Sequence, residues 1–153
     1  MYRYYTRRGE TGSLESTEKI TFVGVVYPWY IDHMEHMNVQ YYASMFDQAT
    51  WVFLSGFGIT SDYMKKNHRV TTAVNQVTKY LHELFSGDVV EVRTLLLEVT
   101  ESKVKFVHTM WRTPDSGAVA TSELIGAHFD TLLHRASPFP AEIASKLTQN
   151  LSR

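Results

Sequence analysis

The apolar residues of this chain change their spacing once, and that change limits the folds open to it. Between residues 39 and 57 they recur at steps of three, four or one, which is the spacing of one buried helix face. The residues on this face are Val39, Tyr42, Ala43, Phe46, Ala49, Phe53, Leu54 and Phe57. From residue 70 to residue 130 the pattern is instead that of β-strands. We therefore expect one long helix followed by a run of strands.

The strand predictions follow from β-branched runs separated by turn residues. The run 20–27 (ITFVGVVY), stopped by Pro28, predicts a strand before the helix. After the helix we expect strands over residues 70–84, 89–100, 104–112 and 118–130, with turns at 85–88, 101–102 and 113–117. Asn38 is the expected N-cap of the long helix, and Gly56 or Gly58 its expected end. Residues 141–147 are expected to form a short closing helix.

A single helix covers only one face of a five-stranded antiparallel sheet. Several of the expected strands are apolar on both faces, which favours cover from a second subunit. We therefore predict the α+β class, with the sheet wrapped around the helix and the protein at least a dimer. Residues 1–17 show no usable period and are expected to form an N-terminal extension. Residues 18–153 are expected to form one domain, because the chain has only 153 residues.

Composition excludes several classes of function. The chain has no cysteine, which rules out disulfides, thiolate catalysis and cysteine-based zinc sites. A formal net charge of -1 without a basic face argues against a nucleic-acid-binding protein. No apolar run approaches the ~20 residues of a membrane span, and the first residues lack the apolar centre of a signal peptide. We therefore expect a cytoplasmic protein without membrane or nucleic-acid partners.

The segment IDHMEHMNVQYY (residues 31–42) concentrates ionisable residues just before the long helix. Asp32, His33, Glu35 and His36 lie close together in it. Such a cluster can form a metal site, an acid–base site, or a solvated and well-capped loop. The spacing of His33 and His36 permits metal binding, but no third ligand follows in a defined pattern. We therefore predict no metal.

The same segment resembles a motif of a known family. Asp32 is followed after three residues by His36, an apolar residue and Asn38. The helix that comes next carries Tyr42, Phe46 and Asp47. This pattern is similar to that of the acyl-CoA thioesterases of the 4-hydroxybenzoyl-CoA thioesterase type. The resemblance implies the hotdog fold, in which a curved antiparallel sheet wraps around one long central helix.

The resemblance extends over residues 20–147. Residues 86–88 (SGD) lie where the family commonly has a Gly-Asp turn, and the ending that contains Asp130, Arg135 and Pro140 is also similar. Two positions depart from the family pattern. Glu35 replaces a glycine that usually precedes the histidine, and Val39 replaces a frequent second asparagine.

Hydrolysis of a thioester needs an oxygen nucleophile for the carbonyl carbon and a stabiliser for the charge that develops on the carbonyl oxygen. Asp32 suits the first role, either as a nucleophile that forms a mixed anhydride or as a base for a water molecule. The N–H groups at the helix start suit the second role, because they lack intrahelical partners and lie at the positive end of the dipole. The resemblance implies the same division of roles. Supporting or helix-entry roles are predicted for Glu35, His36, Met37 and Asn38.

Four aromatic residues lie in or near the same loop and helix: Trp29, Tyr30, Tyr41 and Trp51. Such residues commonly pack in the core or at a subunit interface. They can also form an apolar pocket for an aryl or short acyl group, or a cage for a quaternary ammonium group such as that of a betaine thioester. We predict an acyl pocket formed by these four residues.

The predicted function is hydrolysis of a small or medium acyl-CoA thioester, aryl and betaine-like groups included, to the free acid and coenzyme A. The enzyme is expected to need no cofactor and to form a homodimer or homotetramer. Two alternatives stay open at this point. One is a hotdog dehydratase of hydroxyacyl thioesters that uses His36 and Glu35, and the other is a non-catalytic module that binds acyl thioesters. The acyl group, and the choice between coenzyme A and a carrier protein, are not determined by the sequence.

Overall fold

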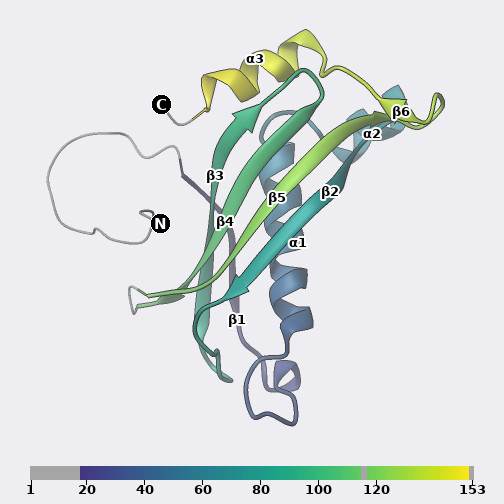
Figure 1. The fold of residues 1–153 in the computed structure, drawn as a ribbon. Helices are drawn as coiled ribbons and strands as arrows, with labels where there is room; N and C mark the ends of the chain where they lie inside the picture. The colour runs from purple at the N-terminus through teal and green to yellow at the C-terminus, as the bar shows by residue number, and fades with distance from the viewer. Residues whose placement is uncertain (1–17, 115–116, 152–153) are drawn as a thin grey trace, which may run out of the picture.

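The computed structural model describes residues 18–114 and 117–151, so the expected extension over residues 1–17 lies outside the described residues. Figure 1 shows the order of the elements along the chain. They are β1 (Lys19–Val25), the 3-10 helix η1 (Pro28–Tyr30), α1 (Val39–Ser55), α2 (Ser61–Asn67), β2 (Arg69–Tyr80), β3 (Val89–Val99), β4 (Lys103–Thr113), β5 (Ala118–Asp130), β6 (Arg135–Ala136) and α3 (Ala141–Gln149).

All neighbouring strands of the sheet are antiparallel. Their order is β1-β3-β4-β5-β2, and the short β6 pairs with β5. The sheet curls along α1, while α3 lies near one end of the sheet and contacts β3 (Figure 1). A curved antiparallel sheet around one long helix is the α+β hotdog architecture, so the predicted fold class is confirmed.

The buried face of α1 divides the core into two clusters along the helix. The first half of α1 packs on the sheet through Tyr42, Met45, Phe46 and Ala49. The second half contributes Phe53 and Leu54 to a cluster that α3 closes with Ile143 and Leu147. Burial of one large apolar side chain stabilises a fold by about 1.5–3 kcal/mol, so the two clusters together hold α1 against the sheet.

The ends of α1 agree with the prediction. Asn38 is the N-cap, and its side-chain oxygen accepts the N–H of Gln40, while Gly56 follows the last helical residue. Two residues of the predicted apolar face, Val39 and Ala43, are nevertheless exposed, and Met45 is buried instead. The predicted face was slightly misplaced because the sheet curves around the helix and does not cover it evenly.

The strand predicted over residues 70–84 ends earlier, at Tyr80. The N–H groups of Leu81 and His82 both donate to the carbonyl oxygen of Val119, which ends the regular pairing with β5. Leu84 then turns into the core, where it is fully buried, and its carbonyl oxygen accepts the N–H of Met37. Leu84 is therefore buried as part of a connecting segment, which sequence patterns do not separate from the end of a strand.

Three short elements, η1, α2 and β6, were not predicted. The hydroxyl of Thr60 caps α2 by accepting the N–H of Tyr63, and His68 ends the helix with a φ of 52°. None of the described helices has the length and apolar character that crossing a membrane requires.

Candidate active site

A tight loop between η1 and α1 carries Asp32. Ile31 and Met37 form an isolated antiparallel bridge that closes the loop. Within it the N–H of Asp32 donates to the carbonyl oxygen of His36 at 3.1 Å, and the N–H of Glu35 donates to the carbonyl oxygen of Asp32 at 2.9 Å. Glu35 has a φ of 66°, in the left-handed region that favours glycine. The family's glycine at this position therefore has a conformational reason, and this chain adopts the same turn with a glutamate.

Both carboxylate oxygens of Asp32 are held by donors. Oδ1 accepts the N–H of Met34 at 2.8 Å, and Oδ2 accepts the side-chain Nδ2 of Asn38 at 2.8 Å. These two hydrogen bonds, in that order of importance, hold the pKa of the Asp32 carboxyl below its usual value. The Asp32 side chain is half-buried, so the two hydrogen bonds orient a carboxylate that still contacts solvent.

Asn38 joins this carboxylate to the start of α1. Its Oδ1 accepts the N–H of Gln40 at 3.0 Å, and its carbonyl oxygen accepts the N–H of Tyr41 at 3.0 Å. The N–H of Val39, the first residue of α1, has no hydrogen-bond acceptor among the described residues. A free N–H at the positive end of a helix dipole is the donor that a developing oxyanion needs.

The loop is fixed to the body of the protein by its last two residues. The side chain of Met37 is buried, and its N–H donates to the carbonyl oxygen of Leu84 at 2.8 Å. The N–H of Asn38 donates to the carbonyl oxygen of Tyr30 at 2.9 Å. Met37 and Asn38 thus anchor the loop to the body of the protein.

The other ionisable residues of the loop are less constrained. Glu35 and His33 are exposed, and Nε2 of His36 lies 3.9 Å from Oε1 of Glu83. Within residues 18–114 and 117–151, no three histidine, aspartate or glutamate side chains gather as a metal site would require. The absence of a metal stays a prediction.

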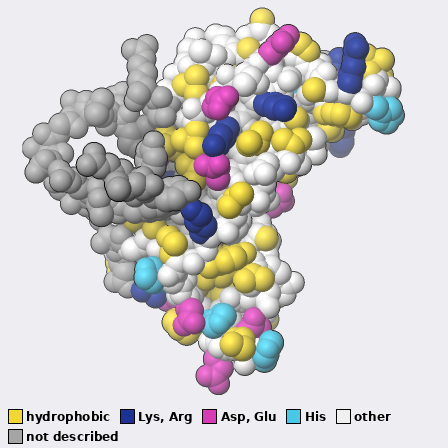
Figure 2. Space-filling model, in the orientation of Figure 1, with side chains coloured by type: hydrophobic (Ala, Val, Ile, Leu, Met, Phe, Trp, Pro, Cys, Tyr) yellow, Lys and Arg dark blue, Asp and Glu magenta, His cyan; other side chains and the backbone are white. Residues whose placement is uncertain are grey.

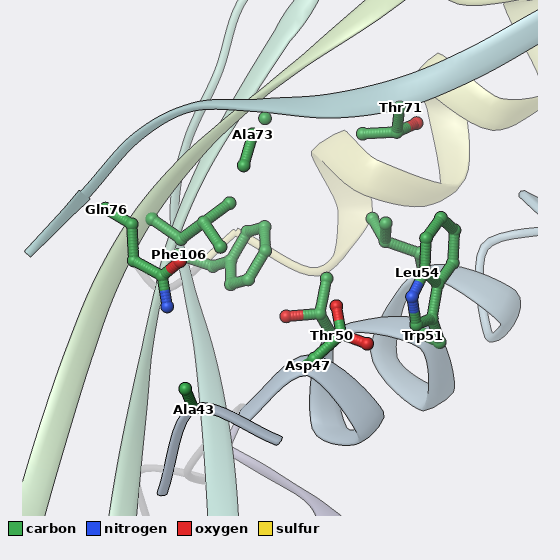
Figure 3. A pocket seen from close by; sticks show the side chains of 11 residues that line it. Ala43, Asp47, Thr50, Trp51, Leu54, Thr71, Ala73, Gln76 and Phe106 are labelled. Atoms are coloured by element: carbon green, nitrogen blue, oxygen red, sulfur yellow. The ribbon is translucent and has the colours of Figure 1, made fainter. Parts of the chain in front are cut away.

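Three cavities lie along α1. The helix-tip cavity, of about 170 Å³, is lined by His36, Met37 and Val39 together with the segment after β2. The tyrosine cavity, of about 230 Å³, lies on the side of β1 and includes Tyr30 and Tyr41. The Asp47 cavity, of about 290 Å³, lies between α1, β2 and β5 (Figure 3). Asp32 lines none of the three, but its neighbours line the helix-tip cavity.

Comparison with known proteins identifies the family. A model of the thioesterase-like superfamily matches residues 26–147. This chain belongs to the thioesterase-like superfamily. The betainyl-CoA thioesterase of Pseudomonas aeruginosa is 25% identical over 127 residues, which are 83% of this chain and 80% of that protein. A Rhizobium protein named L-carnitine dehydrogenase/betainyl-CoA thioesterase is 25% identical over 118 residues, which are 77% of this chain and 24% of that protein.

Solved structures of similar shape agree with this membership. A Staphylococcus aureus protein solved in complex with CoA has a TM-score of 0.82 at 19% identity, covering 89% of this chain and 88% of that chain. A 1,4-dihydroxy-2-naphthoyl-CoA thioesterase from Synechocystis has a TM-score of 0.75 at 12% identity, covering 84% of this chain and 95% of that chain. At such identities the likeness shows the fold. The predicted family is confirmed, and with it the prediction of a thioester hydrolase.

In this member of the thioesterase-like superfamily, three of the four aromatic residues predicted to form one acyl pocket lie together, and the fourth, Trp51, lies apart from them. The rings of Trp29 and Tyr30 meet edge to face, with centroids 6.1 Å apart. Trp29 stacks on Tyr27, with ring centroids 4.6 Å apart, and its ring is two-thirds exposed. Tyr30 and Tyr41 stack on each other at 4.1 Å and line the tyrosine cavity. Trp51 lines the Asp47 cavity. The acyl-pocket role of these four residues stays a prediction, but one cavity does not hold them all.

No site role was predicted for the polar residues of the Asp47 cavity. Asp47 and Thr50 come from α1, and Gln76 comes from β2, which is far from α1 in the sequence. Thr50 also contacts a buried histidine, because its Oγ1 lies 2.9 Å from Nε2 of His108. Asp47 belongs to the helix segment that resembles the family, but it lies beside the apolar helix face, which is the usual place for a solvated charge, and no site role was predicted for it.

Proposed function

We propose that this protein hydrolyses an acyl-CoA thioester to the free acid and coenzyme A, with the Asp32 carboxylate and the N–H of Val39 acting on the same carbonyl group. The observation that supports this proposal is the position of Asn38, which binds the carboxylate through its amide nitrogen and caps the helix through its amide oxygen. One residue therefore links the carboxylate to the first turn of the helix, where the N–H of Val39 is free.

The lowered pKa of Asp32 keeps its carboxylate ionised, as an attack on the thioester carbon requires. In the proposed reaction a carboxylate oxygen attacks the thioester carbon, and the C–S bond breaks to release the thiolate of coenzyme A. Water then hydrolyses the mixed anhydride, which returns the Asp32 carboxylate and yields the free acid. The N–H of Val39 donates to the carbonyl oxygen while that oxygen carries negative charge.

The geometry favours this proposal over the dehydratase alternative. A dehydratase would use His36 as the base with Glu35 in support, but the imidazole of His36 lies near Glu83 and Glu35 is exposed. Thiol release read with a thiol-reactive dye, in parallel with enoyl absorbance, distinguishes the two reactions on a panel of acyl-CoA thioesters. Thiol release without enoyl formation is expected. A panel on which no coenzyme A is released would contradict the proposal.

We further propose that the protein works as a homodimer that pairs through β2 and the adjoining face of α1. Strand β2 is an edge of the sheet, and no strand of the described residues pairs with its outer side. Apolar side chains along this edge and the neighbouring face of α1 are about half exposed; they are Val74, Val77, Trp51 and Val52. A long edge strand beside exposed apolar side chains is a surface that proteins usually cover.

Sedimentation tests the dimer. The wild-type protein is expected to sediment with the mass of two chains. The double variant Val74→Lys/Val77→Lys is expected to sediment closer to the mass of one chain, because charged side chains on an edge strand oppose pairing. Val23→Lys on the opposite edge strand β1 is the matched control, since Val23 is also well exposed. A monomeric wild-type protein, or an equal effect of Val23→Lys, would contradict this interface.

A further inference from the structure

The largest of the three cavities carries a single ionisable side chain. Asp47 lies on α1, and the cavity around it is lined by Thr50, Trp51, Thr71, Gln76 and Phe106 among other uncharged residues (Figure 3). No lysine, arginine or histidine is among its described lining residues. The cavity therefore has the character of a negatively charged site that lacks a counter-charge of its own.

The carboxylate of Asp47 has no partner within the described part of the chain. The ion pairs found there join other acids, and no hydrogen bond to the Asp47 side chain occurs among the described residues. Trp51 and Phe106 add aromatic rings to the same cavity, and Trp51 is 40% exposed. An unpaired carboxylate beside aromatic rings is the combination that attracts an organic cation.

The hydrogen bonds of the polar groups near Asp47 leave acceptor atoms, and not donors, free for a ligand. The hydroxyl of Thr50 donates to the carbonyl oxygen of Phe46 at 3.0 Å, so it can only accept from Nε2 of His108 at 2.9 Å. Nδ1 of His108 then accepts the hydroxyl of Thr94 at 2.7 Å. The proton of Thr50 is therefore directed into the helix, and only lone pairs of this hydroxyl remain for a ligand.

Two further side chains extend this polar wall along β2. Nε2 of Gln76 donates to Oγ of Ser122 at 3.0 Å, which leaves its carbonyl oxygen as the free end of the amide. The hydroxyl of Thr71 is buried without a hydrogen-bond partner among the described residues. A buried polar atom without a partner is uncommon in a folded protein and is consistent with a site that a ligand completes.

We propose that the Asp47 cavity binds the positively charged end of the acyl group, so that the enzyme selects thioesters whose acyl chain carries an ammonium group. This inference rests on the proposed function and adds its substrate class. A neutral aryl group in this cavity would remove water from Asp47 without compensation, which is unfavourable. A quaternary ammonium group would offset the charge and contact the rings of Trp51 and Phe106.

Helix geometry adds a condition to this proposal. Asp47 lies eight residues after Val39 on α1, which is about 12 Å along the helix axis. In a betaine thioester only one methylene group separates the ammonium from the carbonyl carbon. A single chain therefore cannot place such a group against Asp47 and its carbonyl against Val39. In the proposed dimer, the Asp47 cavity of one copy serves the Asp32 loop of the other.

A pair of substrates with the same shape tests the role of Asp47. Betainyl-CoA carries a positively charged nitrogen at the position where 3,3-dimethylbutyryl-CoA has a neutral carbon. We expect the wild-type ratio of their kcat/KM values to favour the cation, and Asp47→Asn to lower that ratio by about tenfold. Asp62→Asn removes an exposed acid on α2 and is expected to leave the ratio unchanged. Competitive inhibition of the wild-type enzyme by tetramethylammonium, but not by tert-butanol, is expected as well.

The outcomes separate this inference from the proposed function. A wild-type enzyme that releases coenzyme A from neither thioester contradicts the proposed function itself. A wild-type enzyme that hydrolyses both thioesters equally, or an unchanged ratio in Asp47→Asn, leaves the hydrolase intact and overturns the role of Asp47. Loss of both activities in a folded Asp47→Asn variant would also overturn it, since Asp47 would then act in the chemistry.

Co-expression tests whether two copies share the site. A heterodimer of Asp32→Asn and Asp47→Asn chains contains one site with both aspartates intact if each site draws on two copies. Its betainyl-CoA hydrolysis should then exceed the mean of the two separate variants. Activity equal to that mean would show that each chain supplies both residues, and would overturn the shared site.

Discussion

The side-chain nitrogen of Asn38 lies 2.8 Å from the carboxylate of Asp32, and the oxygen of the same amide accepts the N–H of Gln40, the second residue of α1. One side chain therefore has two functions, since it fixes the direction of the carboxylate and the start of the helix. Because an amide cannot rotate without breaking both contacts, the distance between Asp32 and the helix tip is set by the Asn38 rotamer.

Replacement of Asp32 by asparagine is expected to lower turnover by roughly a hundredfold or more, because the variant loses the attacking oxygen. Thiol release at saturating acyl-CoA measures the effect. The far-UV circular dichroism and the sedimentation of the variant should match those of the wild type. Glu35→Gln, which removes the exposed carboxylate of the same loop, is the control. Near-normal turnover by Asp32→Asn would show that another group attacks the thioester.

The lowered pKa of Asp32 predicts how the rate depends on pH. A carboxyl whose pKa is lowered stays ionised as the pH falls, so kcat/KM should decline only below 3.8, the ordinary value for aspartate. Asn38→Ser removes the amide donor but retains a capping hydroxyl, so it should shift this decline to higher pH. Circular dichroism at each pH separates loss of rate from loss of fold. An unshifted profile in Asn38→Ser would mean that this hydrogen bond does not tune the carboxyl.

The two functions of Asn38 can be separated by comparing two substitutions. Asn38→Ala removes both the donor to Asp32 and the helix cap, and the lost cap should cost about 1 kcal/mol of the free energy of unfolding. Asn38→Ser should retain most of that stability, but it should lose about as much activity as Asn38→Ala. Urea denaturation together with kcat/KM measures both effects. Equal stability of the two variants would show that the cap contributes little to this fold.

The conformation of Glu35 predicts a stabilising substitution. Glu35 has a φ of 66°, where glycine meets no penalty from a Cβ atom. Glu35→Gly should therefore raise the free energy of unfolding by about 1 kcal/mol. Met34→Gly is the control in the same loop, because Met34 has no positive φ and should lose stability. Thermal denaturation compares the two, and destabilisation by Glu35→Gly would show that the glutamate side chain makes a contribution larger than the strain.

Burial of His108 predicts a loss of stability in acid. Burial lowers the pKa of His108 to about 3 from 6.5, so between these values the unfolded chain binds a proton that the folded chain does not. The stability is complete above pH 6.5 and falls by up to ~1.4 kcal/mol per pH unit as the pH decreases toward 3. His108→Gln should be less stable at neutral pH but should show a smaller slope. Equal slopes in both proteins would assign the acid sensitivity to other groups, His128 among them.

Much of this protein could be predicted from short-range patterns. The limits of α1, the positions of β3, β4 and β5, and the Asp32–Asn38 pair all depend on residues close together in the sequence. The N-cap preference of asparagine and the period of an apolar helix face act within a few residues, so they are visible without the fold. The family resemblance depended on the same local segment.

The Asp47 cavity could not be predicted in this way, because its walls come from elements joined only by folding. A bulge between Ala73 and Asn75 shifts the register of β2 against β5, and alternation along β2 therefore does not reveal that Gln76 faces α1. The contact of His108 with Thr50 likewise joins β4 to α1. The sequence by itself determined the helix and the loop that leads into it. Strand register and sheet curvature, which depend on long-range pairing, decided which side chains surround the cavity of Asp47.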